Sequence, residues 1–484
     1  MLFAKPTFIF LCLFAFAMMD GFSEDRAMTF ISTYDSTAQP FRLFVPGQRS
    51  KRESFPLVVV LHGKGVNQNA WFDYTPIKEY AERHGYVVAA PYGRGDYFYR
   101  GAAEQDVLDI IQTVKGKLSI DPDRVYLVGH SMGGWGTWWV GLRNSDIFAA
   151  IAPMSGFAQM ELLPNALHLD PFIIHDAEDP IVSVEQSRMP VKRLTELGIS
   201  FHYKEEHGYG HSSKMIGDNF PNLFEWMEGH RRNPRPDVIH FVTRTPSRGS
   251  AYWLRILETT QYPNYADVCV MVKQPDTIDI VTENVRRFAI HLSEVPIKGL
   301  ASLKVSLNKG EFSVEKRDGW AIFTWDEKGK KWNYGYDTSQ TLPPWESRVL
   351  TYLAKDSLEV TSPTCLASWA AGLICEETGS DLCLFLNDMF RFPGGPLTED
   401  AALDLYVYPE ERLARFTYGG ESLPKYLDEK SQIFPVGKYD PHMKKTWVVV
   451  APLNLAIQMD KNARLLPEPI GTYLLRALRR KSKM

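Results

Sequence analysis

Short apolar runs alternate with helical patterns through the first half of the chain. The runs at 57–61, 86–90 and 125–128 are apolar at almost every position, which is typical of parallel strands buried on both faces. Between them, residues 77–84 and 106–118 place apolar side chains at helical spacing. Because strands and helices alternate, we expect an α/β fold, with a mostly parallel sheet flanked by helices.

The same alternation continues to about residue 230. The further elements expected there are strands at 41–45, 149–154, 171–175 and 201–205 and a helix at 185–197. Residues 231–236 are rich in arginine and proline and have the composition of a linker. We therefore place an α/β domain at residues 28–232.

Beyond this linker the spacing of apolar residues changes. Seven short runs between residues 238 and 324 are separated by turns, and such a pattern predicts a β-sandwich-like accessory domain at 236–345. From residue 350 the pattern is mixed again, with a helix expected at 364–377 and a strand at 382–387. We expect a C-terminal α+β domain at 350–470.

The first 22 residues have the pattern of a signal peptide. Lys5 supplies a positive charge, the stretch Phe8 to Met19 is apolar, and Ala15 and Ala17 offer a small-residue cleavage site. The apolar stretch is too short to cross a bilayer comfortably. The sequence thus predicts a secreted or periplasmic protein with no transmembrane span after removal of the signal.

Composition narrows the class of protein only modestly. The chain has 484 residues, 44% of them hydrophobic, and a formal net charge of −4, which fits a globular protein and gives no reason to expect nucleic-acid binding. After signal removal four cysteines remain, at 269, 365, 375 and 383. Their spacing matches no metal site, so neither a metal nor a cofactor is expected, and their disulfide state stays open.

Candidate chemistry begins where two of the predicted strands end. The strand at 125–128 runs into Gly129-His130-Ser131-Met132-Gly133, and a helical pattern follows. This strand–turn–helix context is that of a nucleophile elbow with Ser131 at its tip. The Met132 N–H would stabilise an oxyanion, and the Lys64 N–H in His62-Gly63-Lys64-Gly65 is the second candidate donor.

An acid and a base are expected after later strands. Asp176, Glu178 and Asp179 follow the strand at 171–175, and the turn geometry there favours Asp179. A glycine-rich loop after the last strand carries two histidines, of which His211 is the candidate base and His207 the reserve. The order serine, acid, histidine is that of the α/β-hydrolases.

Four of these stretches carry a family resemblance. They are His62–Gly65, Asp121–Gly134, Ala149–Gly156 and Gly210–Ser212. Together they resemble the prolyl-oligopeptidase-like α/β-hydrolases, and most of all their exported predicted-peptidase and feruloyl-esterase-like branch, over about residues 35–230. The resemblance implies a serine hydrolase with Ser131, Asp179 and His211 as its triad, acting through an acyl-enzyme. Ester and peptide substrates both stay open, because both branches share these motifs.

The expected site is open. Only about 16 residues separate the strands that end at 154 and begin at 171, which leaves no room for a large cap. Such a site suits an ester or peptide substrate, including a polymeric one. Trp71, Tyr97 and Tyr99 lie on loops at the same end of the sheet and either form an aromatic binding wall or pack against a neighbouring domain.

A second resemblance concerns the C-terminal part of the chain. Residues 350–465 are similar to the C-terminal domain of 5′-nucleotidases, in which the equivalents of Asn387 and Arg391 help to hold the substrate. The metal-binding phosphoesterase domain of that family is missing from this sequence. A serine hydrolase is therefore the main prediction. The alternative is a non-enzymatic or nucleotide-related binding protein that uses the C-terminal domains.

Overall fold

The computed structural model describes most of the first 338 residues and seven strands beyond them. The described ranges are 22–47, 54–261, 264–299, 301–308 and 310–338, followed by β19 (Val349–Tyr352), β20 (Leu382–Leu386), β21 (Pro396–Thr398), β22 (Arg412–Gly419), β23 (Ile433–Gly437), β24 (Thr446–Pro452) and β25 (Arg464–Pro469). The predicted signal sequence up to residue 21, the predicted helix at 364–377, and Asn387 and Arg391 lie outside the described residues.

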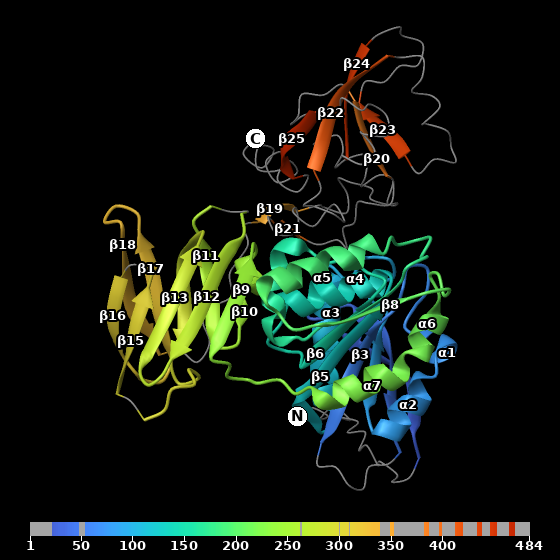
Figure 1. Ribbon diagram of the computed structural model, residues 1–484, viewed down its shortest axis with the longest axis horizontal. Helices are drawn as coiled ribbons and strands as arrows, with labels where there is room; N and C mark the ends of the chain where they lie inside the picture. Colours follow the sequence, from blue (N-terminus) through green and yellow to red (C-terminus); the bar gives the residue numbers. More distant parts are fainter. Residues whose placement is uncertain are drawn as a thin grey trace, which may run out of the picture.

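An eight-stranded sheet forms the centre of the N-terminal domain, in the order β1-β2-β4-β3-β5-β6-β7-β8 (Figure 1). Its strands are β1 (Glu24–Ile31), β2 (Ala38–Val45), β3 (Phe55–Leu61), β4 (Val87–Pro91), β5 (Ile120–His130), β6 (Ala150–Met154), β7 (Phe172–Asp176) and β8 (His202–Glu206). β2 pairs antiparallel with β1 and β4, and the other neighbours are parallel. The expected mostly parallel sheet is therefore present.

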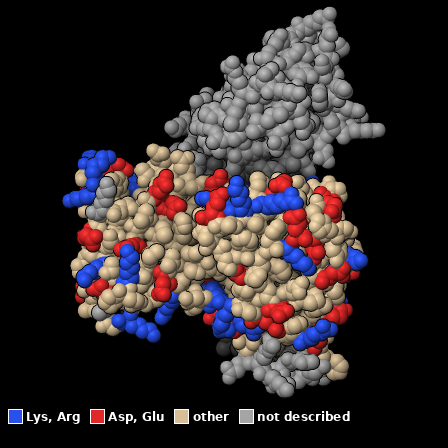
Figure 2. Space-filling model, viewed as in Figure 1, with Lys and Arg blue, Asp and Glu red and all other residues tan. Residues whose placement is uncertain are grey.

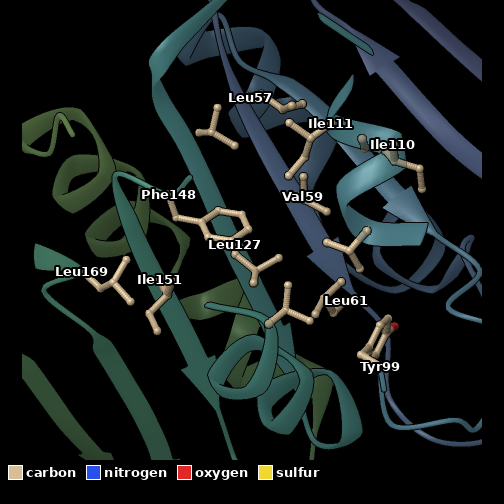
Figure 3. Close-up of a cluster of buried hydrophobic side chains, with 14 of the residues drawn as sticks. Leu57, Val59, Leu61, Tyr99, Ile110, Ile111, Leu127, Phe148, Ile151 and Leu169 are labelled. Atoms are coloured by element: carbon tan, nitrogen blue, oxygen red, sulfur yellow. The ribbon is translucent and has the colours of Figure 1, made fainter. Parts of the chain in front are cut away.

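Helices cover both faces of this sheet and bury two apolar clusters. They are α1 (Ala70–Tyr74), α2 (Ile77–His84), α3 (Ala102–Lys115), α4 (Met132–Arg143), the 3₁₀ helix η1 (Met160–His168), α5 (Glu185–Leu197), α6 (Ser213–Asp218) and α7 (Phe220–Gly229). Side chains of α3, α4, α5 and η1 share one cluster with the strands, and those of α1, α2, α6 and α7 share the other. Figure 3 shows part of the first cluster, where Ile110 and Ile111 of α3 meet residues of β3 and β5.

The largest differences from the predicted strands concern β1 and β5. β1 begins at Glu24, before the predicted start of the domain at residue 28. It is an edge strand that pairs only with β2, and its largely exposed residues give little apolar signal. β5 begins at Ile120, before the predicted start of this strand at residue 125. A register shift between Phe55 and Leu57 on β3 accommodates the added length.

Residues 238–337 form two further sheets, each of five strands, in the orders β10-β11-β14-β17-β18 and β16-β15-β13-β12-β9. The strands are β9 (Val238–Thr243), β10 (Ser250–Ala251), β11 (Leu254–Thr259), β12 (Ala266–Lys273), β13 (Thr277–Glu283), β14 (Val285–His291), β15 (Ser302–Leu307), β16 (Gly310–Glu315), β17 (Trp320–Asp326) and β18 (Lys331–Asp337), with the short 3₁₀ helix η2 (Pro246–Arg248) after β9. Buried residues of both sheets, among them Val268, Phe288 and Phe323, belong to one cluster.

Strand β9 is fixed to the N-terminal domain by side chains of η1 and α4. Asn165 accepts a hydrogen bond from the Val242 N–H at 2.6 Å and donates one to the Val242 carbonyl at 2.9 Å. Val242 itself is buried in a cluster of the N-terminal domain. Arg143 donates to the Thr245 hydroxyl at 3.2 Å. These contacts hold the first strand of the second region against the helical layer of the first.

On the face drawn in Figure 2, basic and acidic side chains are interspersed over the described residues.

Among the described residues, no helix combines the length and the apolar character needed to cross a membrane. In the C-terminal part, five of the described strands form a sheet in the order β23-β20-β24-β22-β25, and β19 pairs with β21.

Candidate active site

Ser131 lies at the sharp turn between β5 and α4. Its backbone has φ 59° and ψ −120°, a left-handed conformation that costs an ordinary residue about 1–2 kcal/mol. The glycines on either side permit the turn, because a Cβ atom at Gly129 would lie 2.1 Å from the Gly133 oxygen and one at Gly133 would lie 2.0 Å from the Leu61 oxygen. The local sequence therefore presents the Ser131 hydroxyl at the end of β5.

His211 links Ser131 to Asp179. Its Nε2 atom lies 2.8 Å from the Ser131 Oγ, and its Nδ1 atom lies 2.6 Å from the Asp179 Oδ2. With Nδ1 donating to the carboxylate, Nε2 is free to accept the hydroxyl proton. The structure thus brings together the three predicted site residues, which lie at or after the ends of β5, β7 and β8.

The Asp179 carboxylate is anchored on both oxygens. Its Oδ1 accepts hydrogen bonds from the N–H groups of Ile181 at 2.8 Å and Val182 at 2.9 Å. Burial opposes its ionisation, but the hydrogen bonds from His211 and from these two N–H groups outweigh burial and lower the pKa of Asp179. The carboxylate therefore stays charged and can stabilise an imidazolium at His211.

The two competing acids have other partners. Asp176 is fully buried and its Oδ2 accepts the Tyr209 N–H at 2.8 Å. Glu178 contacts the Nδ1 of His207 at 2.9 Å and accepts the Gly208 N–H at 2.8 Å. Both acids hold the loop that carries His211, and the reserve candidate His207 is paired with Glu178, away from Ser131.

His175 is a buried residue that the sequence analysis did not single out. It occupies the fourth position of β7, and its Nδ1 lies 2.7 Å from the Ser187 Oγ. Its Nε2 lies 2.9 Å from the Val182 carbonyl and 3.5 Å from the Asp179 Oδ2. Burial lowers the pKa of His175, so a neutral ring supports the turn that holds Asp179. A histidine inside an apolar strand was the only available signal.

His130, the residue before the nucleophile, stacks near the base. The centroid of its ring lies 4.7 Å from that of His211, at an interplanar angle of 35°. Burial, followed by the charge on His211, lowers the pKa of His130 to about 3. His130 is therefore neutral at physiological pH and adds no competing positive charge beside His211.

A cavity of about 260 Å³ opens beside Ser131. Its lining residues are His62, Gly63, Lys64, Val66, Ala70, Trp71, Tyr74, Thr75, His130, Ser131, His211, Ser213 and Ile216. Tyr74 and Val66 are exposed, and they form an apolar rim at the surface. A small, largely apolar group fits such a cavity, with its reacting carbon next to the Ser131 hydroxyl.

The two predicted oxyanion donors lie on the segments that surround the nucleophile. Met132 is the first residue of α4, so its N–H lies at the positive end of the helix dipole. Lys64 lines the same cavity as Ser131, and a Cβ at the neighbouring Gly63 would lie 3.6 Å from the Ser131 Cβ. This close approach of the loop is what a donor at Lys64 needs, and the role of both N–H groups remains a prediction.

The three predicted binding aromatics have different positions. Trp71 lines the cavity while its Nε1 donates to the Leu61 carbonyl at 2.9 Å. Tyr99 is fully buried instead, and its hydroxyl donates to the His62 carbonyl at 3.3 Å. Figure 3 places Tyr99 at one end of the apolar cluster. Its predicted contact with substrate is therefore corrected, because the ring packs beneath the loop. Tyr97 does not line this cavity.

The described residues around Ser131 include no group of three metal-ligating side chains; such a group, Asp170, His202 and His230, occurs elsewhere in the domain. The chemistry at Ser131 is that of a nucleophile, a base and an acid in hydrogen-bonded sequence. Such an arrangement can transfer an acyl group from an alcohol or amine to water.

Comparison with known proteins supports the α/β-hydrolase fold. Residues 58–272 match the model of the Alpha/beta hydrolase family. A bifunctional acetylxylan esterase/xylanase of Neocallimastix patriciarum is 30% identical over 135 residues, which cover 27% of this chain and 20% of the relative. A feruloyl esterase B of Neurospora crassa is 28% identical over 127 residues, or 24% of this chain and 43% of the relative.

The chain thus spans less than half the length of each of these curated relatives. Among solved structures, a thermostable esterase is 26% identical and has a TM-score of 0.38, with 43% of this chain and 63% of that chain covered. The prolyl-oligopeptidase-like branch expected from the sequence is not among these matches, which are to esterases. The N-terminal domain of this chain has an α/β-hydrolase fold, and its sequence is similar to that of esterases.

Proposed function

We propose that this protein is an exported serine esterase in which Ser131, His211 and Asp179 form the catalytic triad. The observation that carries the proposal is the hydrogen-bonded series Ser131–His211–Asp179, with distances of 2.8 Å and 2.6 Å. The similarity to an acetylxylan esterase and a feruloyl esterase favours an ester over a peptide. The apolar cavity beside Ser131 favours a small acyl group.

The proposed mechanism is acyl transfer to water. The Ser131 Oγ attacks the ester carbonyl while the His211 Nε2 takes its proton, and the negative Asp179 stabilises the resulting imidazolium. The N–H groups of Met132 and Lys64 receive the oxyanion. His211 then protonates the leaving alcohol, and the acyl-enzyme is hydrolysed by water activated at the same histidine.

The decisive experiment combines a substrate screen with one matched pair of variants. Wild-type protein is assayed with p-nitrophenyl acetate, methyl ferulate and a chromogenic proline peptide, and we expect turnover of the esters. Ser131→Ala should lower kcat by at least about 10³-fold, since the nucleophile is lost. Ser183→Ala, at an exposed position after β7, should leave kcat unchanged.

Labelling with a fluorophosphonate probe gives an independent readout. We expect wild type and Ser183→Ala to be labelled and Ser131→Ala to remain unlabelled. Turnover of the peptide with none of the esters would replace the ester proposal by a peptidase. A wild-type protein that neither reacts with the probe nor turns over any substrate would favour the non-enzymatic binding protein.

The proposal extends to the rest of the chain. The pattern of residues 1–22 supports export. We interpret residues 236–345 as a β-sandwich-like accessory domain, since two sheets there share one buried cluster. Residues 350–470 remain assigned by sequence as an α+β domain. Their resemblance to the 5′-nucleotidase domain stays a prediction. Limited proteolysis followed by mass spectrometry tests both boundaries.

A further inference from the structure

Three metal-ligating side chains meet at one edge of the N-terminal sheet. The Asp170 Oδ2 lies 2.5 Å from the His230 Nε2 and 3.3 Å from the His202 Nε2. One ligand atom from each residue lies within 4.8 Å of the others. The sequence predicted no metal site. These three residues lie far apart in the chain, and only the fold brings them together.

The cluster lies at the end of the strands opposite to Ser131. Asp170 precedes β7 and His202 is the first residue of β8, whereas Asp179 and His211 follow the other ends of the same two strands. A strand of five residues separates the two edges by roughly 15 Å. His230 follows α7, the last helix of the domain. The cluster therefore joins three segments without touching the candidate active site.

Two of the three side chains are oriented by hydrogen bonds on their remaining polar atoms. The His230 Nδ1 lies 2.6 Å from the Trp226 carbonyl, to which it donates. The Ser200 hydroxyl donates to the Asp170 Oδ1 at 2.5 Å. Metal-binding histidines in proteins usually donate their second ring N–H to a carbonyl or carboxylate, which directs the other nitrogen towards the ion. His230 has this arrangement.

We propose that Asp170, His202 and His230 bind one divalent zinc ion in a structural site. Two imidazoles and a carboxylate are ligands that zinc accepts, with water as the fourth ligand. Ligand atoms about 2.0–2.1 Å from a tetrahedral ion lie about 3.3 Å from one another, a separation that Asp170 and His202 already have. The ion replaces the direct contact between Asp170 and His230 and requires that pair to open by less than about 1 Å.

The site is accessible to an ion from solvent. The side chain of His202 is 56% exposed, whereas those of Asp170 and His230 are 18% and 24% exposed. Two ligands are thus held in place by the fold, and the third is free to close over the ion. Because the ligands come from the loop before β7, the start of β8 and the end of α7, a bound ion ties these segments together and stabilises the domain.

The test uses the full-length protein after removal of metal with a chelator. Zinc chloride is titrated in by isothermal calorimetry, and thermal unfolding is followed with and without one equivalent of zinc. We expect one ion per chain and a higher melting temperature in its presence. Cobalt(II) serves as a second probe, because four-coordinate cobalt gives a strong visible absorption band.

His202→Ala is the main variant, because its position is largely exposed and the fold should persist. The zinc affinity of this variant should fall by at least about tenfold, and the shift of its melting temperature on zinc addition should disappear. Ser200→Ala loses only an orienting hydrogen bond, so its zinc affinity should fall by about tenfold or less. His240→Ala is the matched control, since His240 and Asp267 form a half-buried two-membered pair with Nε2 and Oδ1 3.0 Å apart. Its zinc affinity should equal that of wild type.

Two results overturn the proposal. The first is a wild-type protein that takes up no zinc or cobalt, which would leave Asp170 and His230 as a simple ion pair. The second is a His202→Ala variant that binds zinc as tightly as wild type, which would place the ion elsewhere. Both readouts are independent of esterase activity, so they stand whether or not the proposed function holds.

Discussion

Three carboxylates, one at the end of β7 and two just after it, support the candidate base His211 and its loop. Asp179 contacts the His211 ring itself, Asp176 accepts the Tyr209 N–H, and Glu178 accepts the Gly208 N–H. One short segment therefore fixes the imidazole and also the backbone of the loop that carries it. This division explains why the sequence alone offers three acids in competition for one part.

Asp179→Asn tests the part assigned to the acid. The amide keeps the size of the side chain but loses the charge that stabilises the imidazolium and favours the required tautomer of His211. We expect kcat on p-nitrophenyl acetate to fall by about 10³–10⁴-fold, with little change in melting temperature. Glu178→Gln, the matched control, should retain kcat within about threefold. Equal effects of the two substitutions would contradict the assignment.

His130 should make stability depend on pH. Its pKa is lowered to about 3 in the folded protein, chiefly by burial, so between pH 6.5 and 3 the unfolded chain binds the additional proton. Stability is therefore lost as the pH falls, by about 2 kcal/mol between pH 7 and pH 5. Urea unfolding of wild type and His130→Gln at both pH values measures this loss.

The His130→Gln protein should lack that part of the pH dependence. His84→Gln serves as control, because His84 lies at the end of α2 beside Glu228 at the surface and its replacement should leave the slope of stability with pH nearly unchanged. An identical pH dependence in wild type and His130→Gln would show that His130 titrates normally in the folded protein.

At the scale of elements, the spacing of apolar residues predicted correctly the helices that bury one face and the strands that are buried on both faces. The helices predicted at 77–84 and 185–197 have those bounds in the structure, and the fully apolar β3 and β4 lie where expected. β1 was missed because an edge strand buries little, and α7 was not predicted. The predicted α/β fold is confirmed by the sheet topology and the family match.

The candidate site was predictable to the extent that its signals are local. The elbow around Ser131 and the loop at His211 are short motifs at strand ends, so sequence identified them. The position of Tyr99 under His62, the contact of His175 with the Asp179 turn, and the meeting of Asp170 with His230 depend on tertiary packing. The spacing of these residues along the chain does not predict such contacts.

The elbow is also the element most sensitive to added volume. A Cβ at Gly133 would lie 2.0 Å from the Leu61 backbone oxygen, and backbone cannot move aside as a flexible side chain can. We expect Gly133→Ala to destabilise the domain by at least about 2 kcal/mol. Gly229→Ala, at a position with no atom within 4 Å of the added Cβ, should melt within a degree or two of wild type.

At the scale of the whole molecule, the two regions up to residue 338 are joined through buried polar groups. Asn165 satisfies both backbone groups of Val242 and also donates to the Leu142 carbonyl at 2.9 Å. Glu104 forms a buried ion pair with Arg143, with the Glu104 Oε2 and the Arg143 Nε 3.2 Å apart. β9 pairs with β12 and is also hydrogen-bonded to Asn165 of the N-terminal domain, so we expect the two regions to unfold together.

Asn165→Ala tests this coupling. The substitution leaves buried N–H and carbonyl groups of β9 without partners, at a cost of at least about 2 kcal/mol. Differential scanning calorimetry should show one main transition in wild type and either a lowered or a divided transition in the variant. Asn333→Ala, on the exposed side of β18, should leave the trace unchanged. A wild-type trace for Asn165→Ala would contradict the coupling.

The left-handed backbone conformation of Ser131 affects the thermal stability of the protein and the selection that acts on this position. Every folded copy maintains that conformation, with or without a substrate. The backbone strain at Ser131 therefore lowers the stability of an otherwise well-packed domain at all times. A Ser131→Gly chain, which adopts the same φ without strain, should outlast the active protein on heating. Selection for stability alone would therefore favour glycine at position 131, whereas the proposed acyl transfer requires the serine.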